Sequence, residues 1–469
     1  MRSPPVNHTR SQMPLLSWIY VGSIVLQPMN LFIFADSSTS GLTISASRFL
    51  QAAVLIGLSF RVASVAVSQR SATRLAVPST VNPLYRDYIK YFCLTVAAGL
   101  VGVASGAYDL PTAYDFRPEA TQTVLSRFLF QPVLRPLIEY FISAYYFVYF
   151  VVLPAYLLRR QKDVGYLLSA FKAAVVVSLV VGAAGSWLPF IGEILPRNLA
   201  DFRSPGNRFH GLFGEPKDAF GYLFLGLAML HLGAFHKGLA LRKIWAVVII
   251  AAAIESESAS GLVGIVCFVG LYAIYSLRRI SIRSALQLVG LASLVAALLY
   301  GSFVSSQRLV VYGESISGLW AALENRERLP DGIAMVNNEI YPLYDVSVKW
   351  RNLEMLPIVI GSGFGSASAV NNRLSIGIPS EHMNPQSQLV RTIYESGLVG
   401  LYYFVMAFVR PVQRLTKRLP SRVRHRFIVL SLLVIGCCLG NRNVAPFIYL
   451  GAVVAMFRAR QDQVARMSG

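Results

Sequence analysis

Residues 164–188 read VGYLLSAFKAAVVVSLVVGAAGSWL, and Lys172 is the one charged side chain in this stretch. A helix of about 20 apolar residues is long enough to cross a hydrocarbon core of about 30 Å. The stretch is continuously apolar, whereas a strand of a membrane barrel alternates apolar and polar side chains. It therefore predicts a membrane-spanning α-helix.

Comparable runs recur along the 469 residues, which are 55% hydrophobic and 14% charged. Soluble proteins are about 25% charged, and the mean hydropathy of +0.53 is also that of an apolar chain. We predict an all-α integral membrane protein with about twelve transmembrane helices. The predicted spans lie near residues 16–34, 46–68, 87–106, 129–157, 164–188, 217–235, 242–254, 259–277, 284–304, 389–409, 426–439 and 444–457.

The basic residues are not spread evenly over the predicted loops. Alternate loops and the C-terminal tail carry clusters of Lys and Arg, and the longest cluster lies at residues 410–426. Because positive charge collects in cytoplasmic loops, we expect both termini in the cytoplasm. The same rule accounts for the net charge of +20, and no nucleic-acid-binding motif supports a nucleic-acid partner.

Two segments on the predicted outer side, at residues 189–216 and 305–388, contain several arginines. Long loops cross the membrane largely regardless of charge, so these arginines do not contradict the topology. Their presence on the outer side needs another explanation, such as binding of an anionic ligand. Loops above about 15 residues are usually functional or disordered, and the tryptophans of the second segment favour order. We predict transmembrane helices 1–9 in residues 1–304, an extracytoplasmic subdomain in 305–388, and helices 10–12 with a cytoplasmic tail in 389–469.

The segment RFHGLFGEPK at residues 208–217 stands between two apolar spans and carries more functional groups than a plain turn needs. Pro216 suits the first turn of a helix, so Glu215 is expected at a helix N-terminus, where negative charge is favoured. Beside Arg208 and His210, its carboxylate is suited to act as a general base or to orient a hydroxyl. The alternative role for Glu215 is that of a helix cap.

A second constellation begins with GSGFG at residues 361–365 and continues with Glu381, His382 and Gln386. Glycines allow the backbone to approach a ligand closely. No strand–helix unit surrounds them, so a dinucleotide site is not indicated. The glycines form either a ligand cradle or a flexible loop, and His382 is either a proton acceptor or an ordinary surface histidine.

Ionisable side chains inside predicted spans form a third group of candidates. Arg135 and Glu139 are one helical turn apart, so they either pair with each other or contact substrate. The turn SESASG at residues 256–261 contains small residues that permit close helix packing. The four cysteines fall in apolar spans and show no disulfide or zinc spacing.

The order of these segments resembles the O-antigen ligase and polymerase superfamily of bacterial envelope membrane proteins. The resemblance covers roughly residues 200–467 and includes the large outer loop. Its motifs are Arg-x-x-Gly-x-Phe-x-Glu-Pro at 208–216, the Ser-rich turn at 256–261, the glycines at 361–365 and Glu-x-Gly-x-x-Gly at 395–400. The chain departs from the family where His-Asn is usual, because Gln386-Ser387 stands there and His382 is the nearest histidine.

The resemblance implies a GT-C-like helical fold and a glycosyltransferase of the bacterial cytoplasmic membrane. Its substrate would be an oligosaccharide on undecaprenyl diphosphate, used at the outer face without a metal, cofactor or nucleotide sugar. The leading expectation is a polysaccharide polymerase that transfers the glycan to a lipid-linked repeat unit. The alternatives are a ligase that transfers finished glycan to lipid A core or protein, a transporter or flippase, and a scaffold for an export complex.

Residue roles follow from the resemblance together with the chemistry of phosphate. The planar fork of arginine suits phosphate oxygens, which assigns Arg203, Arg208 and Arg351 to the diphosphate. Glu215 or His382 would act as the base, and Arg208 would also serve catalysis. The other predicted substrate contacts are His210, Gly363, Gln386 and Arg135. The expected partners are the lipid-linked oligosaccharide, membrane lipid, a chain-length regulator and a flippase.

Overall fold

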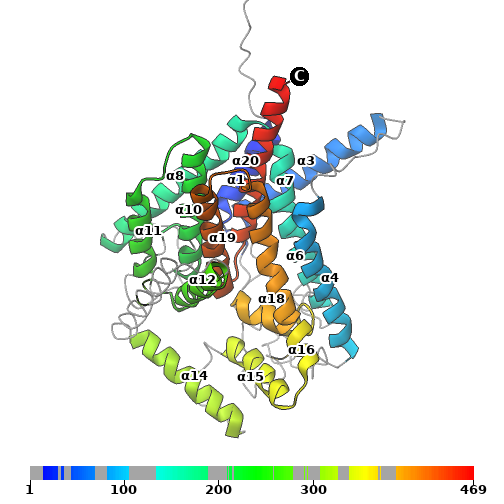
Figure 1. Ribbon diagram of the computed structural model, residues 1–469, viewed down its shortest axis with the longest axis vertical. Coiled ribbons are helices and arrows are strands. Elements are labelled where there is room, and N and C mark those ends of the chain that lie inside the picture. The colour runs from blue at the N-terminus through cyan, green and yellow to red at the C-terminus, as the bar shows by residue number, and fades with distance from the viewer. Residues whose placement is uncertain are drawn as a thin grey trace, which may run out of the picture.

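The protein is helical in the computed structural model (Figure 1). The structure describes residues 14–29, 33–35, 44–68, 82–104, 134–187, 209, 211–213, 216–256, 258–277, 290, 293, 307–325, 337–367, 370 and 387–468. Long continuous apolar runs form helices because a helix satisfies every backbone N–H and C=O within its own segment.

The described helices follow the apolar runs along the chain. They are α1 (Leu15–Leu26), α3 (Ala46–Ser68), α4 (Asn82–Ala104), α6 (Leu134–Phe147), the π-helical η3 (Val148–Val152), α7 (Leu153–Leu157), α8 (Gln161–Trp187), α10 (Pro216–His236), α11 (Lys243–Glu255), α12 (Ala259–Leu277), α14 (Gln307–Asn325), α15 (Asn337–Arg351), α16 (Met355–Ile360), α18 (Gln388–Leu415), α19 (Ser421–Gly440) and α20 (Ala445–Ser468). Two short strands, β1 (Ile33–Ala35) and β2 (Ile44–Ser45), form an antiparallel pair after α1.

Within the described residues, six helices are long and apolar enough to cross a membrane, judged by length and composition. They are Pro83–Ala104, Pro136–Leu157, Gln161–Ala184, Asp218–His236, Gln388–Leu415 and Ser421–Gly440. Shorter apolar helices occupy Leu15–Leu26, Ala46–Phe60 and Ser260–Ser276. The chain is therefore a helical membrane protein, whereas the number of twelve spans stays a prediction.

The first predicted span is too long. Helix α1 ends at Leu26 and β1 begins at Ile33, whereas the prediction continued the helix to residue 34. Pro28 has no backbone N–H, so it cannot donate the next hydrogen bond of the helix. The ninth predicted span, at residues 284–304, lies outside the described residues except at positions 290 and 293.

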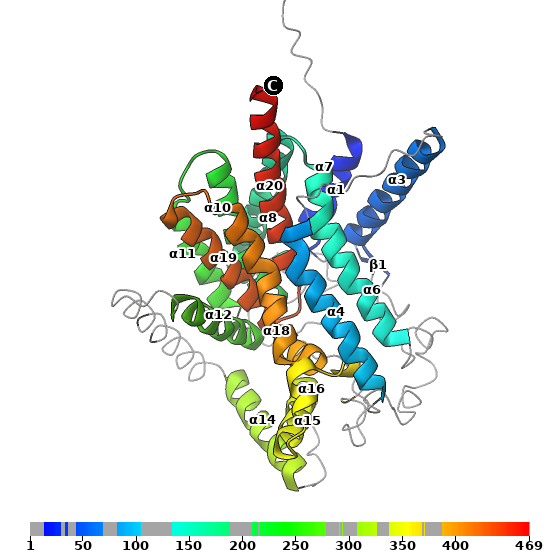
Figure 2. The same ribbon diagram turned by 45° about the vertical axis from the view of Figure 1, so that its right-hand side comes forward.

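The packed centre of the bundle is formed largely by α10, α18, α19 and α20 (Figure 2). Helices α12 and α19 approach each other closely at glycines. A Cβ added at Gly440 would lie 2.1 Å from the Ser260 carbonyl oxygen, and one at Gly264 would lie 2.9 Å from the Cys437 Cα. This geometry agrees with the close packing expected of the Ser-rich turn at 256–261.

One end of the bundle gathers basic residues that the charge pattern assigns to the cytoplasm. At the end of α18, Arg410 forms an ion pair of 2.5 Å with Asp87 of α4, and Arg414 donates to the Pro83 carbonyl. In α20, Arg460 donates to the carbonyl of Phe235 at the end of α10. These contacts lie toward the end of the molecule where α20 finishes (Figure 2).

Helices α14, α15 and α16 lie at the opposite end of the molecule in both views (Figures 1 and 2). Helices α14 and α15 pack on each other, with the Trp320 and Tyr344 rings 5.7 Å apart and the Tyr344 hydroxyl donating to the Leu323 carbonyl. The described part of the predicted outer subdomain is therefore helical and packed. Its boundaries at 305 and 388 stay predictions.

Candidate functional site

The glycine segment at residues 361–365 lies against a break in α18. The Ser362 N–H donates to the Tyr394 carbonyl at 3.0 Å, and the Gly363 N–H donates to the Glu395 carbonyl at 2.7 Å. In a continuous helix, N–H groups of the next turn would donate to these two carbonyls. Helix α18 is interrupted two residues later, at Gly397, where φ is 65° and ψ is −171°.

Glycine is required on both sides of this contact. Gly361 has φ 85° and ψ −174°, so both it and Gly397 occupy a region of backbone space that is essentially restricted to glycine. A Cβ at Gly361 would lie 2.4 Å from the Glu395 carbonyl carbon, and one at Gly397 would lie 2.3 Å from the Val359 carbonyl oxygen. The two glycine motifs of the sequence therefore form one backbone-to-backbone contact.

The Glu395 side chain is held inside this contact. Its Oε1 accepts a hydrogen bond from the Gly365 N–H at 2.8 Å. Its Oε2 accepts one from Nε of Arg391, which lies one turn earlier in α18, at 2.9 Å. The Glu395 carboxylate is 1% exposed. A buried carboxylate is tolerated when it is paired and hydrogen-bonded, and the glycine segment and Arg391 together meet that need.

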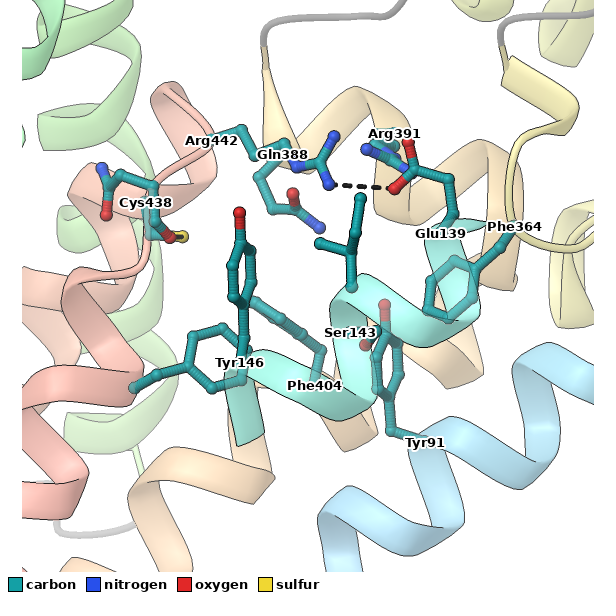
Figure 3. A pocket seen from close by; sticks show the side chains of 13 residues that line it. Tyr91, Glu139, Ser143, Tyr146, Phe364, Gln388, Arg391, Phe404, Cys438 and Arg442 are labelled. Atoms are coloured by element: carbon teal, nitrogen blue, oxygen red, sulfur yellow. Dashed lines mark hydrogen bonds and ion pairs between the residues drawn. The ribbon is translucent and has the colours of Figure 1, made fainter. Parts of the chain in front are cut away.

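Arg391 extends the network to two further charged side chains. Its Nη2 lies 2.8 Å from Glu139 Oε2 on α6, and the same oxygen accepts Arg442 Nη2 at 2.9 Å (Figure 3). Arg442 belongs to the loop between α19 and α20 and is 30% exposed, whereas Arg391 and Glu139 are almost fully buried. The chain of contacts, Arg442–Glu139–Arg391–Glu395, ties α6, α18 and the α19–α20 loop together.

A partly open pocket with a volume of about 40 Å³ lies beside this network. Charged and polar side chains form part of its wall, and aromatic rings form much of the rest (Figure 3). The lining residues are Tyr91, Glu139, Ile142, Ser143, Tyr146, Phe364, Gln388, Arg391, Phe404, Cys438, Arg442, Asn443 and Phe447. A concave, largely apolar pocket with a few convergent polar groups is the usual form of a small-molecule site.

The first turn of α10 lies against the loop that carries Arg442. The Asn441 side chain donates to Asp218 Oδ1 at 3.0 Å, and a Cβ at Gly221 would lie 2.6 Å from Nδ2 of Asn443. Helix α10 begins at Pro216, as the sequence predicted for the residue after Glu215. The end of the 208–217 motif is therefore joined to one wall of the pocket.

The Ser-rich turn meets the same region. The Phe209 N–H donates to the Glu255 carbonyl at 3.1 Å, which joins the 208–217 motif to the turn between α11 and α12. The Ser258 hydroxyl accepts the Gly261 N–H at 3.1 Å and so caps the start of α12. Ser260 packs on Gly440 at the end of α19, and Asn441 is the next residue in the sequence. The Ser-rich turn therefore lies close to Asn441. The motifs far apart in the sequence thus converge near one end of the bundle.

Most of the predicted site residues lie outside the described residues. They are Arg203, Arg208, His210, Glu215, His382 and Gln386, together with the side chain of Arg135. The structure places Gly363 against Glu395, where it approaches another helix rather than an open space. It places Arg351 on α15 in a 2.6 Å ion pair with Glu324, with both side chains largely exposed and neither lining the pocket.

Sequence reasoning missed Arg391 and the pairing of Glu139 with Arg442. The sequence suggested Arg135 as the partner of Glu139, because the two are neighbours on the same helix face. Arg442, one of the two partners that the structure shows, is 303 residues away in sequence, and the Arg135 side chain lies outside the described residues. Two signals were present in the sequence. A glutamate inside a membrane span, such as Glu139, requires a cation as its partner. Arg391 lies four residues before Glu395, the acid of the Glu-x-Gly motif, which is the spacing of a pair on one helix face.

No protein-family model matches this chain, and no curated protein matches it.

Proposed function

We propose that this chain is a membrane glycosyltransferase of the polysaccharide-polymerase type. It transfers a glycan from undecaprenyl diphosphate to a lipid-linked repeat unit at the outer face of the bacterial cytoplasmic membrane. The observation that carries the proposal is the meeting of the motif segments: the glycine segment holds Glu395, and the start of α10 adjoins the Arg442 loop. A shared site is what the resemblance requires of these segments.

The proposed topology has about twelve spans, cytoplasmic termini and a GT-C-like arrangement. The distribution of charge supports it. Arg410 and Arg414 of α18 lie at one end of the bundle, and the Arg391–Glu395 pair of the same helix lies toward the other. Positive charge marks the cytoplasmic end. The pocket then faces the outer side, where lipid-linked glycans are assembled.

The proposed reaction forms one bond and breaks another. The acceptor hydroxyl attacks the anomeric carbon of the donor glycan, and the bond from that carbon to the diphosphate breaks. A base receives the hydroxyl proton, and the lipid diphosphate leaves with the bonding electron pair. Glu215 is the proposed base, because the helix that follows it begins against the pocket wall, and Arg203 and Arg208 are the proposed diphosphate ligands.

The test compares two arginines with matched environments. Arg442 pairs with Glu139 and Arg410 pairs with Asp87; both arginines are 30% exposed, and both carboxylates are almost fully buried. Cells lacking the gene are complemented with wild type, Arg442→Ala or Arg410→Ala, and their lipid-linked and surface glycans are separated by size. A polymerase predicts single lipid-linked repeat units without long polymer in Arg442→Ala cells, and long polymer in Arg410→Ala cells at equal protein level.

Other outcomes identify the other functions. Full-length polymer that accumulates on the lipid carrier would identify a ligase. If deletion changes no lipid-linked species, the glycosyltransferase proposal fails, and a transporter or scaffold becomes the better explanation. If the two arginine variants lose polymer equally, the pocket is not the reaction site.

A further inference from the structure

We propose that the end of the bundle where α4 begins and α18 finishes binds the headgroup of an anionic phospholipid, with the acyl chains along the exposed face of α4. This surface is independent of the proposed reaction, because it lies at the opposite end of α18 from Arg391. Three features of the described residues carry the proposal. They are unpaired positive charge, an apolar stripe that ends at this charge, and two tyrosines beside it.

The start of α4 packs against the end of α18 (Figure 2). Arg410 of α18 forms its 2.5 Å ion pair with Asp87 of α4, and Arg414 donates to a backbone carbonyl in the first turn of α4. Arg86 and Lys90 lie one turn apart on α4, and both side chains are exposed, as is that of Arg414. Three cations thus flank the Arg410–Asp87 pair, and we call them the cationic cluster: Arg86, Lys90 and Arg414.

The cationic cluster has no carboxylate partner among the described residues. Asp87 is the one acid of α4, and it already pairs with Arg410. The three cations form no ion pair with any residue that the structure describes. The segment that leads into α4 offers no acid, because no Asp or Glu stands between Asp36 and Asp87. Unbalanced like charges at the edge of a membrane repel one another, so an anion between them is favoured.

An apolar stripe runs along the exposed face of α4 and ends at the cationic cluster. Its exposed side chains recur every three or four residues, which places them on one face of the helix. They are Ile89, Cys93, Val96, Leu100 and Val103. Helix α4 is long and apolar enough to cross a membrane, so this face is suited to contact acyl chains. The cations then stand where acyl chains meet phosphate groups.

Two tyrosines of α18 lie beside these charges. Arg410 Nη2 donates to the Tyr402 hydroxyl at 2.6 Å, and Lys90 Nζ lies 5.4 Å from the centre of the Tyr403 ring. Tyrosine is enriched at the boundary between the hydrocarbon core and the headgroups. The lysine stem is also long enough to extend its ammonium group to that boundary. Both features agree with a cluster at the depth of the lipid phosphates.

Net charge decides which phospholipid fits this surface. The ammonium group of phosphatidylcholine balances its own phosphate, whereas phosphatidylglycerol carries an uncompensated negative charge. Guanidinium groups hold phosphate oxygens through paired hydrogen bonds, and basic residues at a membrane surface attract anionic lipids. The cationic cluster should therefore select phosphatidylglycerol over phosphatidylcholine.

The test uses the full-length protein in phosphatidylcholine nanodiscs, with a bimane label on Cys93. Cys93 is exposed on the stripe, one turn from Lys90, whereas Cys437 and Cys438 are buried, and Cys267 is replaced by alanine. Phosphatidylglycerol or phosphatidylcholine, each spin-labelled at the same acyl carbon, is added in increasing fractions. Quenching of the bimane measures how strongly each lipid associates with this face.

Three single variants separate the cationic cluster from general surface charge. Arg86→Gln and Lys90→Gln each remove one charge from the cluster. Arg242→Gln is the control, because Arg242 is also exposed but precedes α11, which packs on α10. We expect the wild type and the Arg242 variant to prefer phosphatidylglycerol at least about tenfold. The preference should fall about fivefold in each of the other two variants.

Three results would overturn the lipid site. Equal quenching by the two lipids in the wild type would show that the cluster does not select charge. An equal loss in the Arg242 variant would assign the preference to the overall charge of the surface. Replacing sodium chloride by sodium phosphate at equal ionic strength should change nothing, because both salts only screen the charges. Loss of the preference in phosphate alone would assign the cluster to a soluble phosphate compound.

Discussion

Replacing Arg391 by methionine should destabilise the protein far more than the same change at an exposed arginine. The guanidinium is 3% exposed and is shared by two carboxylates, at 2.8 Å from Glu139 and 2.9 Å from Glu395. Methionine keeps an unbranched apolar stem of similar length, but Glu395 loses the cation with which it pairs, and Glu139 keeps Arg442. Because burial makes an unpaired charge costly, the loss falls on the glutamates that remain.

The size of the loss follows from the burial. Removing one partner of a buried ion pair costs about 3–5 kcal/mol. Here Glu395 loses its cation and Glu139 keeps Arg442, so we expect about 4 kcal/mol. Arg351→Met is the matched control. Its ion pair with Glu324 is as short, at 2.6 Å, but the side chains are 55% and 42% exposed. Solvent screens such a pair, so its loss should cost about 0–1 kcal/mol.

The assay is reversible unfolding of the purified protein by SDS titration in mixed micelles, followed by circular dichroism. A second variant tests the cause: Arg391→Met combined with Glu139→Gln and Glu395→Gln removes the two carboxylates that contacted Arg391 and should recover at least half of the lost stability. A loss below about 2 kcal/mol for Arg391→Met would contradict this expectation, because the buried glutamates would then not depend on Arg391 for their stability. So would a triple variant no more stable than the single one.

Three further predictions concern the surrounding contacts. Gly397→Ala should cost about 1–3 kcal/mol of stability from backbone strain alone, and more from the clash of the new Cβ with Val359. Gly270 has open space around it, so Gly270→Ala should be neutral or slightly stabilising. SDS unfolding of the two variants measures the difference. Gly440→Leu should separate α12 from α19, because even a Cβ would lie 2.1 Å from the Ser260 carbonyl; disulfide crosslinking between cysteines placed on the two helices should weaken while α4–α18 crosslinking persists. Asn441→Leu should lower the free energy of unfolding by about 1 kcal/mol, because it removes the hydrogen bond to Asp218. It should also reduce polymer formation at equal protein level, because Asn441 positions the start of α10 beside the pocket. Unchanged polymer at equal protein level would contradict that positioning role.

The sequence alone was sufficient for the helical membrane class and for most helix positions. Each of these depends on a local run of apolar residues, as at 164–188, which forms a helix whatever its neighbours are. It was also sufficient for the start of α10 at Pro216, because proline suits a first turn. It was wrong at α1, where hydrophobicity continued past Pro28 and the missing backbone donor ended the helix first.

The candidate site depends on contacts that no local pattern contains. The sequence indicated that the glycines at 361–365 and the acid at 395 mattered, but only the folded chain shows that Gly365 donates to Glu395. It indicated that Glu139 needs a cation and offered Arg135, one turn away. The Arg135 side chain lies outside the described residues, and tertiary packing brings Arg391 and Arg442 to Glu139 from another helix and another loop. Helix formation is decided by neighbours in sequence, whereas the partner of a buried charge is decided by whichever helices pack together.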